Sequence, residues 1–111
     1  MGSKDIFATD PRGRPVELWD IQWDHVVAKH PDVFEYGATR RHFKKAIEEP
    51  ADGCIYESHK YADCDIYYVR LSKYFEVQVV VRFENEIGEI KTAHLVKERP
   101  KGETIRWMKG Q

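Results

Sequence analysis

Side chains that can bind a phosphate group and transfer a proton fall on three neighbouring stretches of predicted strand. Residues 74–84 alternate between apolar and polar side chains, which is the pattern of a strand with one face on a core. This stretch is the centre of the predicted sheet, and its polar face carries Gln78 and Arg82. The strands before and after it add polar candidates to the same surface: Tyr68, Arg70, Thr92 and His94.

Such a surface combines cations, hydroxyls and an imidazole. These groups can bind a phosphodiester, stabilise the charge that develops on it and move a proton near neutral pH. The alternative is that they are ordinary cross-strand polar pairs on a wetted sheet. The register of residues 89–96 stays open, because a one-residue slip exchanges the two faces. Either Ile90, Thr92, His94 and Val96 or Lys91, Ala93 and Leu95 face the core.

Two further histidines, His25 and His30, lie on a predicted helix. They are five positions apart and therefore do not share a face. His30 continues the apolar stripe at the helix end, where a cation meets the negative end of the dipole, so a structural role is an equal alternative to catalysis. No histidine pair has zinc-site spacing and no Cys/His cluster exists, so we expect no metal. The sequence also lacks a phosphate-binding glycine loop and a serine nucleophile elbow, so we expect no cofactor.

The elements that must position these residues follow in a simple order. A short strand over residues 15–19 precedes a helix from residue 21 to about 30, capped by Asp20, and a second helix over 39–49. Strands follow over residues 54–58, 65–71, 74–84, 89–96 and 104–107. The turn before residue 89 is Asn85-Glu86-Ile87-Gly88, in which Gly88 is able to take a positive φ. This order predicts an α+β fold, with two or three N-terminal helices packed on one face of a four- to five-stranded antiparallel sheet. The other face is expected to be open.

Length and charge limit the possible functions. The chain of 111 residues has room for one domain, placed at 13–108 between a flexible segment over 1–12 and a tail over 109–111. Its 18 basic and 19 acidic residues give a net charge of −1, so no DNA binding is expected. The chain has two cysteines, and we expect them to be free thiols in a reducing cytosol. It has neither an apolar run of membrane-spanning length nor a signal peptide, so we expect a cytoplasmic protein with no membrane contact.

Several short motifs resemble a known group of nucleases. The matching segments are Gly13-Arg14-Pro15-Val16-Glu17-Leu18, Trp23-Asp24-His25-Val26, His30-Pro31-Asp32, Ala46-Ile47-Glu48-Glu49-Pro50 and Gly88-Glu89-Ile90-Lys91-Thr92-Ala93-His94. Their order and spacing resemble phage- and mobile-element-associated families of the BECR fold. That group includes barnase, EndoU nucleases, tRNA-cleaving colicins and RelE-type toxins. The resemblance covers roughly residues 13–108 and predicts a BECR-like sheet.

The resemblance implies a metal-independent ribonuclease of the toxin or phage-conflict type. The ribose 2′-hydroxyl would attack the neighbouring phosphate and leave a cyclic phosphate. The helix histidines of the family fall on His25 and His30, and its strand threonine falls on Thr92. We assign the acid or base to His25 or His94, and phosphate binding to Arg82 or Lys91, with Arg70 on the same surface. Tyr68 is expected to stack on a base. The implied partners are RNA (tRNA or mRNA) and a cognate antitoxin or another protein.

Two other classes of function remain open. The same scaffold can serve as a non-catalytic module that binds RNA or protein, antitoxin-like or regulatory, whose exposed strand pairs with another chain. The near-neutral charge and the scattered histidines favour this alternative. A small-molecule enzyme using the same sheet face is the third possibility, although the sequence contains no cofactor motif.

Overall fold

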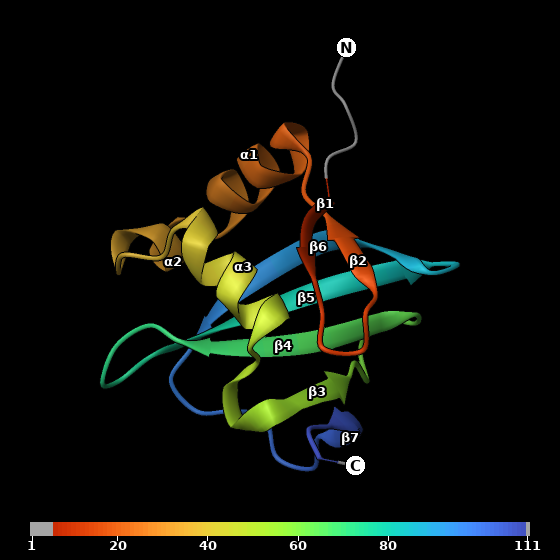
Figure 1. The fold of residues 1–111 in the computed structure, drawn as a ribbon. Helices are drawn as coiled ribbons and strands as arrows, with labels where there is room; N and C mark the ends of the chain where they lie inside the picture. Colours follow the sequence, from red (N-terminus) through yellow and green to blue (C-terminus); the bar gives the residue numbers. More distant parts are fainter. Residues whose placement is uncertain (1–5, 111) are drawn as a thin grey trace.

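Seven strands in residues 6–110, the part of the chain that the computed structural model describes, form one mixed sheet (Figure 1). The strand order across the sheet is β1-β2-β6-β5-β4-β3-β7. The strands are β1 (Ile6–Thr9), β2 (Pro15–Glu17), β3 (Cys54–Glu57), β4 (Cys64–Arg70), β5 (Glu76–Glu84), β6 (Ile87–Val96) and β7 (Thr104–Met108). The helices are α1 (Asp20–Lys29), α2 (Pro31–Glu35) and α3 (Arg40–Glu48), followed by a short 3-10 turn, η1 (Ala51–Gly53).

This sheet shows that the predicted four- to five-stranded antiparallel architecture was wrong. β1 lies in the N-terminal segment for which no strand was predicted, and β2 pairs in parallel with β6 through Val16 and Gly88. β1 and β2 span only four and three residues, which is too short to display the alternation that marks a strand. The parallel pairing joins two strands that are separated by three helices and three strands along the chain, and no local pattern encodes it. Residues 1–5 and 111 lie outside the described residues.

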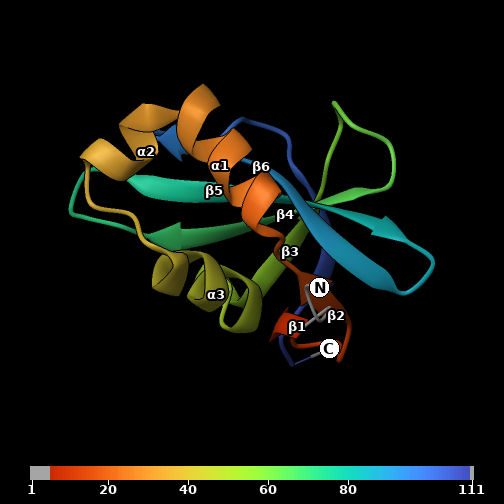
Figure 2. The same cartoon turned by 90° about the horizontal axis from the view of Figure 1, so that it is seen from above.

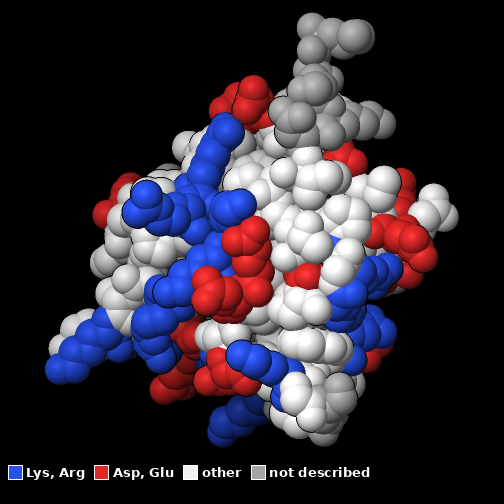
Figure 3. Space-filling view, in the orientation of Figure 1, with Lys and Arg blue, Asp and Glu red and all other residues white. Residues whose placement is uncertain are grey.

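The remaining strands and two of the helices begin and end close to their predicted positions. α2 was not predicted, because Pro31 was taken only as the end of α1. Pro31 instead occupies the first position of α2, where its missing N–H costs nothing. His30, between the two helices, has φ −133° and ψ 62°, so the chain bends there. α3 buries Phe43, Ala46 and Ile47 as predicted, and its basic residues add to the Lys and Arg on this face of the molecule (Figure 3).

The helices cover different parts of the sheet. α3 packs on β4 and β5, while α1 and α2 contact β6 at the side of the sheet (Figure 2). The Trp23 ring joins the three helices, because its centroid lies 5.0 Å from that of Phe34 in α2 and 5.1 Å from that of Phe43 in α3. Below them, Val77 and Val79 of β5 are completely buried. The polar face of β5 therefore points away from the helices, as the alternation predicted.

A β-bulge in β6 decides the register that the sequence left open. Val80 pairs with Thr92 but Val81 pairs with Ile90, so Lys91 is the extra residue. Ile90 and Ala93 are both buried on the helix side, a spacing that neither candidate register contains. The bulge therefore leaves Lys91 and Thr92 next to each other outside the helix-side core. Gly88 does not take a positive φ, and in this turn the residue with a positive φ is Asn85. A Cβ atom at residue 88 would lie only 2.7 Å from the Phe83 ring.

The sheet face opposite the helices is less open than the sequence predicted. Cys64, Ile66, Tyr68 and Val80 form a second buried cluster on this face. β6 and β7 lie at distant positions in the sheet, so residues 97–103 cross this face to connect them. Arg99 in that crossing segment makes two hydrogen bonds to the Glu76 carboxylate. Its Nε donates to Oε1 at 2.8 Å, and its Nη2 donates to Oε2 at 2.7 Å. Its guanidinium also lies 4.3 Å from the centroid of the Tyr68 ring.

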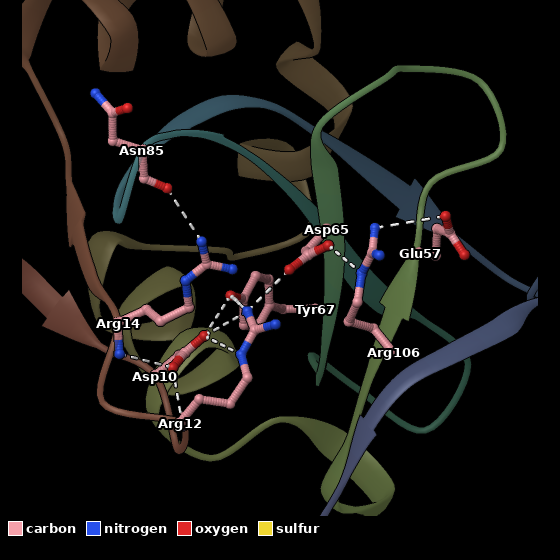
Figure 4. Close-up of polar contacts among 8 residues, drawn as sticks. All are labelled: Asp10, Arg12, Arg14, Glu57, Asp65, Tyr67, Asn85 and Arg106. Carbon is pink, nitrogen blue, oxygen red and sulfur yellow. Dashed lines mark hydrogen bonds and ion pairs between the residues drawn. The ribbon is translucent and has the colours of Figure 1, made fainter.

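On the helix side, a polar network joins strands that are far apart in the sheet (Figure 4). Arg12 in the β1–β2 turn contacts the Oδ2 atoms of Asp10 at 2.7 Å and of Asp65 in β4 at 2.8 Å. From the other side, Arg106 of β7 contacts Asp65 Oδ1 at 3.0 Å. β1 and β4 are separated by three strands in the sheet order, so the turn after β1 can reach Asp65 only because the sheet curls. Tyr67 donates to Asp10, and burial together with the nearby Asp10 charge raises the pKa of Tyr67.

Candidate functional site

A cleft between α1 and the β5–β6 strands brings together three of the predicted site residues. His25 of α1, Arg82 of β5 and Lys91 of β6 all line this cavity of about 390 Å³. The other lining residues are Ile21, Gln22, Glu89 and Ile90. We call this cavity the α1–β6 cleft. It contains two cations, an imidazole and a carboxylate, which are the groups needed to bind a phosphate and to exchange protons beside it.

Each of the three residues is placed by a local feature of the fold. His25 lies next to Val26, the residue that α1 buries, so its imidazole stays exposed toward the cleft. Val81 of β5 is buried in the helix-side core, so Arg82, the next residue, points to the other face of the sheet. Lys91 is the bulged residue of β6. Arg82 has one ion-pair partner, Glu84 at 3.2 Å, and both side chains are exposed, so a bound anion can replace this weak contact.

Glu89 and Gln22 complete the cleft and were not predicted from the sequence. The Gln22 amide nitrogen donates to Glu89 Oε1 at 2.7 Å, and within residues 6–110 no hydrogen bond is made to the other oxygen of this carboxylate. Glu89 pairs with Arg82 across the β5–β6 ladder. The turn between Glu84 and Ile87 sets the pairing of Arg82 with Glu89, which was missed because Ile87 and Gly88 were taken as part of the turn.

A larger hollow of about 680 Å³ lies at the end of β4 and β5 and also borders Arg82. Arg14 and Arg106 line it together with Asp63, Asp65 and Glu84. Arg106 is already bound to Asp65, and Arg14 donates to the Asn85 carbonyl oxygen at 3.2 Å. The charges in this hollow are therefore largely paired within the protein. For this reason we place the candidate site in the smaller α1–β6 cleft.

His30 and His94 meet each other at the start of α2 and do not line the α1–β6 cleft. Their ring centroids are 4.5 Å apart in an edge-to-face arrangement. His94 is partly buried, and burial lowers its pKa, as do the nearby His30 and Lys60, while Asp32 opposes the shift. The structure thus separates His94 from His25, the other residue considered as the acid or base.

Acidification should destabilise the protein through His94. Because the pKa of His94 is lowered in the folded state, His94 binds a proton at a lower pH there than in the unfolded chain, where its pKa has the ordinary value of 6.5. The contribution of His94 to the free energy of unfolding should therefore be constant above about pH 6.5 and decrease as the pH falls below that value toward the lowered pKa of the folded state. Urea denaturation at a series of pH values, with the wild type beside His94→Gln, measures this effect. Parallel pH dependences for the two proteins would contradict the prediction.

The remaining predicted residues lie elsewhere on the sheet. Tyr68 is completely buried, so its ring is not available to stack on a base in this conformation. Its hydroxyl donates to Glu103 Oε2 at 2.6 Å, and burial, followed by this hydrogen bond, raises the pKa of Tyr68. Arg70 pairs with Glu76 at the other end of β5, roughly 20 Å along the strand from Arg82. Thr92 is half-buried beside Val80.

A second hollow, which we call the loop pocket, lies next to Thr92 and His94. It has a volume of about 260 Å³ between the sheet, the β3–β4 loop and the crossing segment 97–103. Ile66 and Val80 are its apolar sheet residues. Polar residues also line it: Ser58, His59, Lys60, Gln78, His94, Lys101 and Glu103. Lys91 of the α1–β6 cleft lies 4.9 Å from the centroid of the Tyr61 ring, which also lines the loop pocket.

Comparison with known protein families, curated proteins and solved structures found no match. Among residues 6–110, no group of three or more His, Cys, Asp or Glu side chains is placed to hold a metal ion. None of the helices described is long and apolar enough to span a membrane.

Proposed function

We propose that this protein is a metal-independent ribonuclease whose reaction takes place in the α1–β6 cleft. The observation that carries the proposal is the convergence of His25, Arg82 and Lys91 on one cavity from three separate elements. The BECR-like nuclease resemblance of the sequence motifs is in keeping with this chemistry. The predicted antiparallel architecture is not part of the argument, because the proposal rests on the side chains of the cleft.

The cleft residues can divide the reaction between them. The Glu89 carboxylate accepts the proton of the ribose 2′-hydroxyl as its oxygen bonds to phosphorus. The His25 imidazolium donates a proton to the 5′-oxygen as the bond between that oxygen and phosphorus breaks. Arg82 and Lys91 stabilise the negative charge that accumulates on the other phosphate oxygens. The products are a 2′,3′-cyclic phosphate and a 5′-hydroxyl, and no metal enters any of these steps.

Cleavage of RNA in the presence of excess EDTA tests this proposal. Purified protein is incubated with total RNA and with a tRNA pool across a pH series, and the ends of the products are identified. We expect cleavage that EDTA does not reduce and that leaves cyclic-phosphate ends. Loss of cleavage in EDTA with recovery on adding Mg²⁺ would overturn the metal-free mechanism. No cleavage by protein shown to be folded would overturn the nuclease function itself.

An exposed strand at the edge of the sheet favours one alternative, a protein-binding module. β7 is the last strand in the sheet order and pairs only with β3. Its Ile105 side chain is 50% exposed. An edge of this kind can accept a strand from another chain. If the folded protein does not cleave RNA, pairing of a partner strand with β7 becomes the preferred function.

A further inference from the structure

The loop pocket lies beside the α1–β6 cleft. Val80 of the pocket and Arg82 of the cleft are alternate residues of β5, about 7 Å apart on the same face. Lys91 and Tyr61 form a second connection, because the Lys91 ammonium lies over the Tyr61 ring. A nucleotide with its phosphate beside Arg82 and Lys91 therefore has the loop pocket as the neighbouring space for its base.

The apolar and aromatic surfaces of the pocket suit a flat ring. Ile66 and Val80 are buried in the sheet below it, at 9% and 2% exposure. Tyr61 at its border is half-buried, and the Lys60 and Lys91 ammonium groups lie 5.2 and 4.9 Å from its ring centroid, so a base that stacks on this ring replaces the Lys60 contact. Single-stranded RNA bases are commonly bound by stacking on aromatic side chains and by hydrogen bonds to their Watson–Crick edges. The pocket offers both kinds of contact.

Among the polar residues of the pocket, which include the cationic Lys60 and Lys101, Gln78 and Glu103 present hydrogen-bond acceptors. Gln78 uses its amide nitrogen to donate to the Tyr68 hydroxyl at 3.0 Å, and that hydroxyl donates to Glu103 Oε2. This chain of donors leaves the Gln78 carbonyl oxygen and Glu103 Oε1 without a partner among the described residues. A ligand that donates hydrogen bonds can satisfy these two oxygens. Guanine has two adjacent donors on its Watson–Crick edge, the ring N1–H and the 2-amino group.

We propose that the loop pocket binds a guanine base, with Glu103 and Gln78 as the residues that select it. The choice of an RNA base as the occupant rests on the proposed nuclease function. Glu103 Oε1 and the Gln78 carbonyl oxygen accept one guanine donor each, whereas adenine, cytosine and uracil do not present two adjacent donors on this edge. Tyr61 stacks on the base, and Lys91 positions the attached phosphate in the α1–β6 cleft.

Binding of nucleosides without a phosphate tests the pocket independently of catalysis. Guanosine, adenosine, cytidine and uridine are titrated separately into isotope-labelled protein and followed by NMR. We expect guanosine to shift the signals of Ile66, Val80 and the Gln78 side-chain amide, with at least tenfold weaker binding of the other three. Glu103→Gln should weaken guanosine binding about tenfold, because one acceptor becomes a donor while the Tyr68 hydroxyl keeps a partner. Equal binding of all four nucleosides, or stronger binding of another one, would overturn the proposal.

The control variant is Glu98→Gln, which removes the same charge from an exposed position in the same crossing segment. It should bind guanosine like the wild type. Tyr61→Ala provides a second test that leaves the Tyr68 hydrogen bonds intact, and it should also weaken binding. Guanosine binding that depends on Glu103, without RNA cleavage, would sustain the pocket and reject the nuclease. RNA cleavage without guanosine binding, and with an unchanged base preference in Glu103→Gln, would reject the pocket alone.

Discussion

Replacing His25 by alanine is expected to lower kcat for RNA cleavage by about 10²- to 10⁴-fold, the usual contribution of a positioned general acid. His25 is exposed on α1, and no other histidine lines the α1–β6 cleft, so no second imidazole is placed there to replace it. Alanine favours helix formation and should leave the fold intact. KM should change little, because Arg82 and Lys91 supply the phosphate contacts. Steady-state kinetics on a short RNA substrate separate the two parameters.

The pH dependence distinguishes proton transfer from a structural role of His25. The wild type should lose activity on the alkaline side as its acid loses a proton, and His25→Ala should lack that decrease in its residual activity. Asp24→Ala is the matched control, because Asp24 is the exposed neighbour of His25 and lies outside the cleft. It should cleave RNA like the wild type. An active His25→Ala variant would remove His25 from the mechanism even if the ribonuclease activity itself is real.

The sequence predicted local elements better than their connections. The alternation along β5 and the 3.6-residue period of α3 indicate which face of each element packs on the core. The predicted buried face was correct for both elements. The pairing of β2 with β6, the curl of the sheet and the crossing segment 97–103 all join residues far apart in the chain. No local period encodes such contacts. This is why the predicted sheet was wrong although most of its strands were present.

The same limit applies to the candidate site. Arg82 could be placed on the polar face because β5 alternates without interruption. The contents of the α1–β6 cleft depend on a bulge at Lys91, and a bulge breaks the period on which a prediction from sequence depends. His25 and His94 have the same chemistry, and only the tertiary structure places the first in the cleft and the second beside His30. Tyr68 was expected to be exposed, because the sequence does not show that residues 97–103 cross this face of the sheet.

Replacing Arg12 by methionine is expected to lower the free energy of unfolding by about 3–5 kcal/mol, the usual cost of removing one partner from a buried ion pair. Arg12 has a side chain that is 15% exposed and lies between Asp10 and Asp65, which are 0% and 5% exposed. Burial opposes its charge, but hydrogen bonds to the two carboxylates outweigh that effect and raise the pKa of Arg12. Chemical denaturation measures the loss.

The two carboxylates should contribute unequally to this loss. Asp65 keeps Arg106 as a cationic partner, so the variant leaves its charge partly compensated. Asp10 keeps the Tyr67 hydroxyl and two backbone N–H groups, but no cation. Adding Asp10→Asn to Arg12→Met should therefore recover part of the stability, because it removes the uncompensated charge.

An exposed ion pair of the same chain provides the scale for this comparison. Lys44→Met breaks the pair with Glu48 on the surface of α3, where both side chains are more than a third exposed, and should cost less than about 1 kcal/mol. If Arg12→Met costs no more than Lys44→Met, the network of Asp10, Arg12 and Asp65 does not hold the curl of the sheet. A large difference would mean that one buried cation joins the β1–β2 turn to β4 and stabilises the curled sheet.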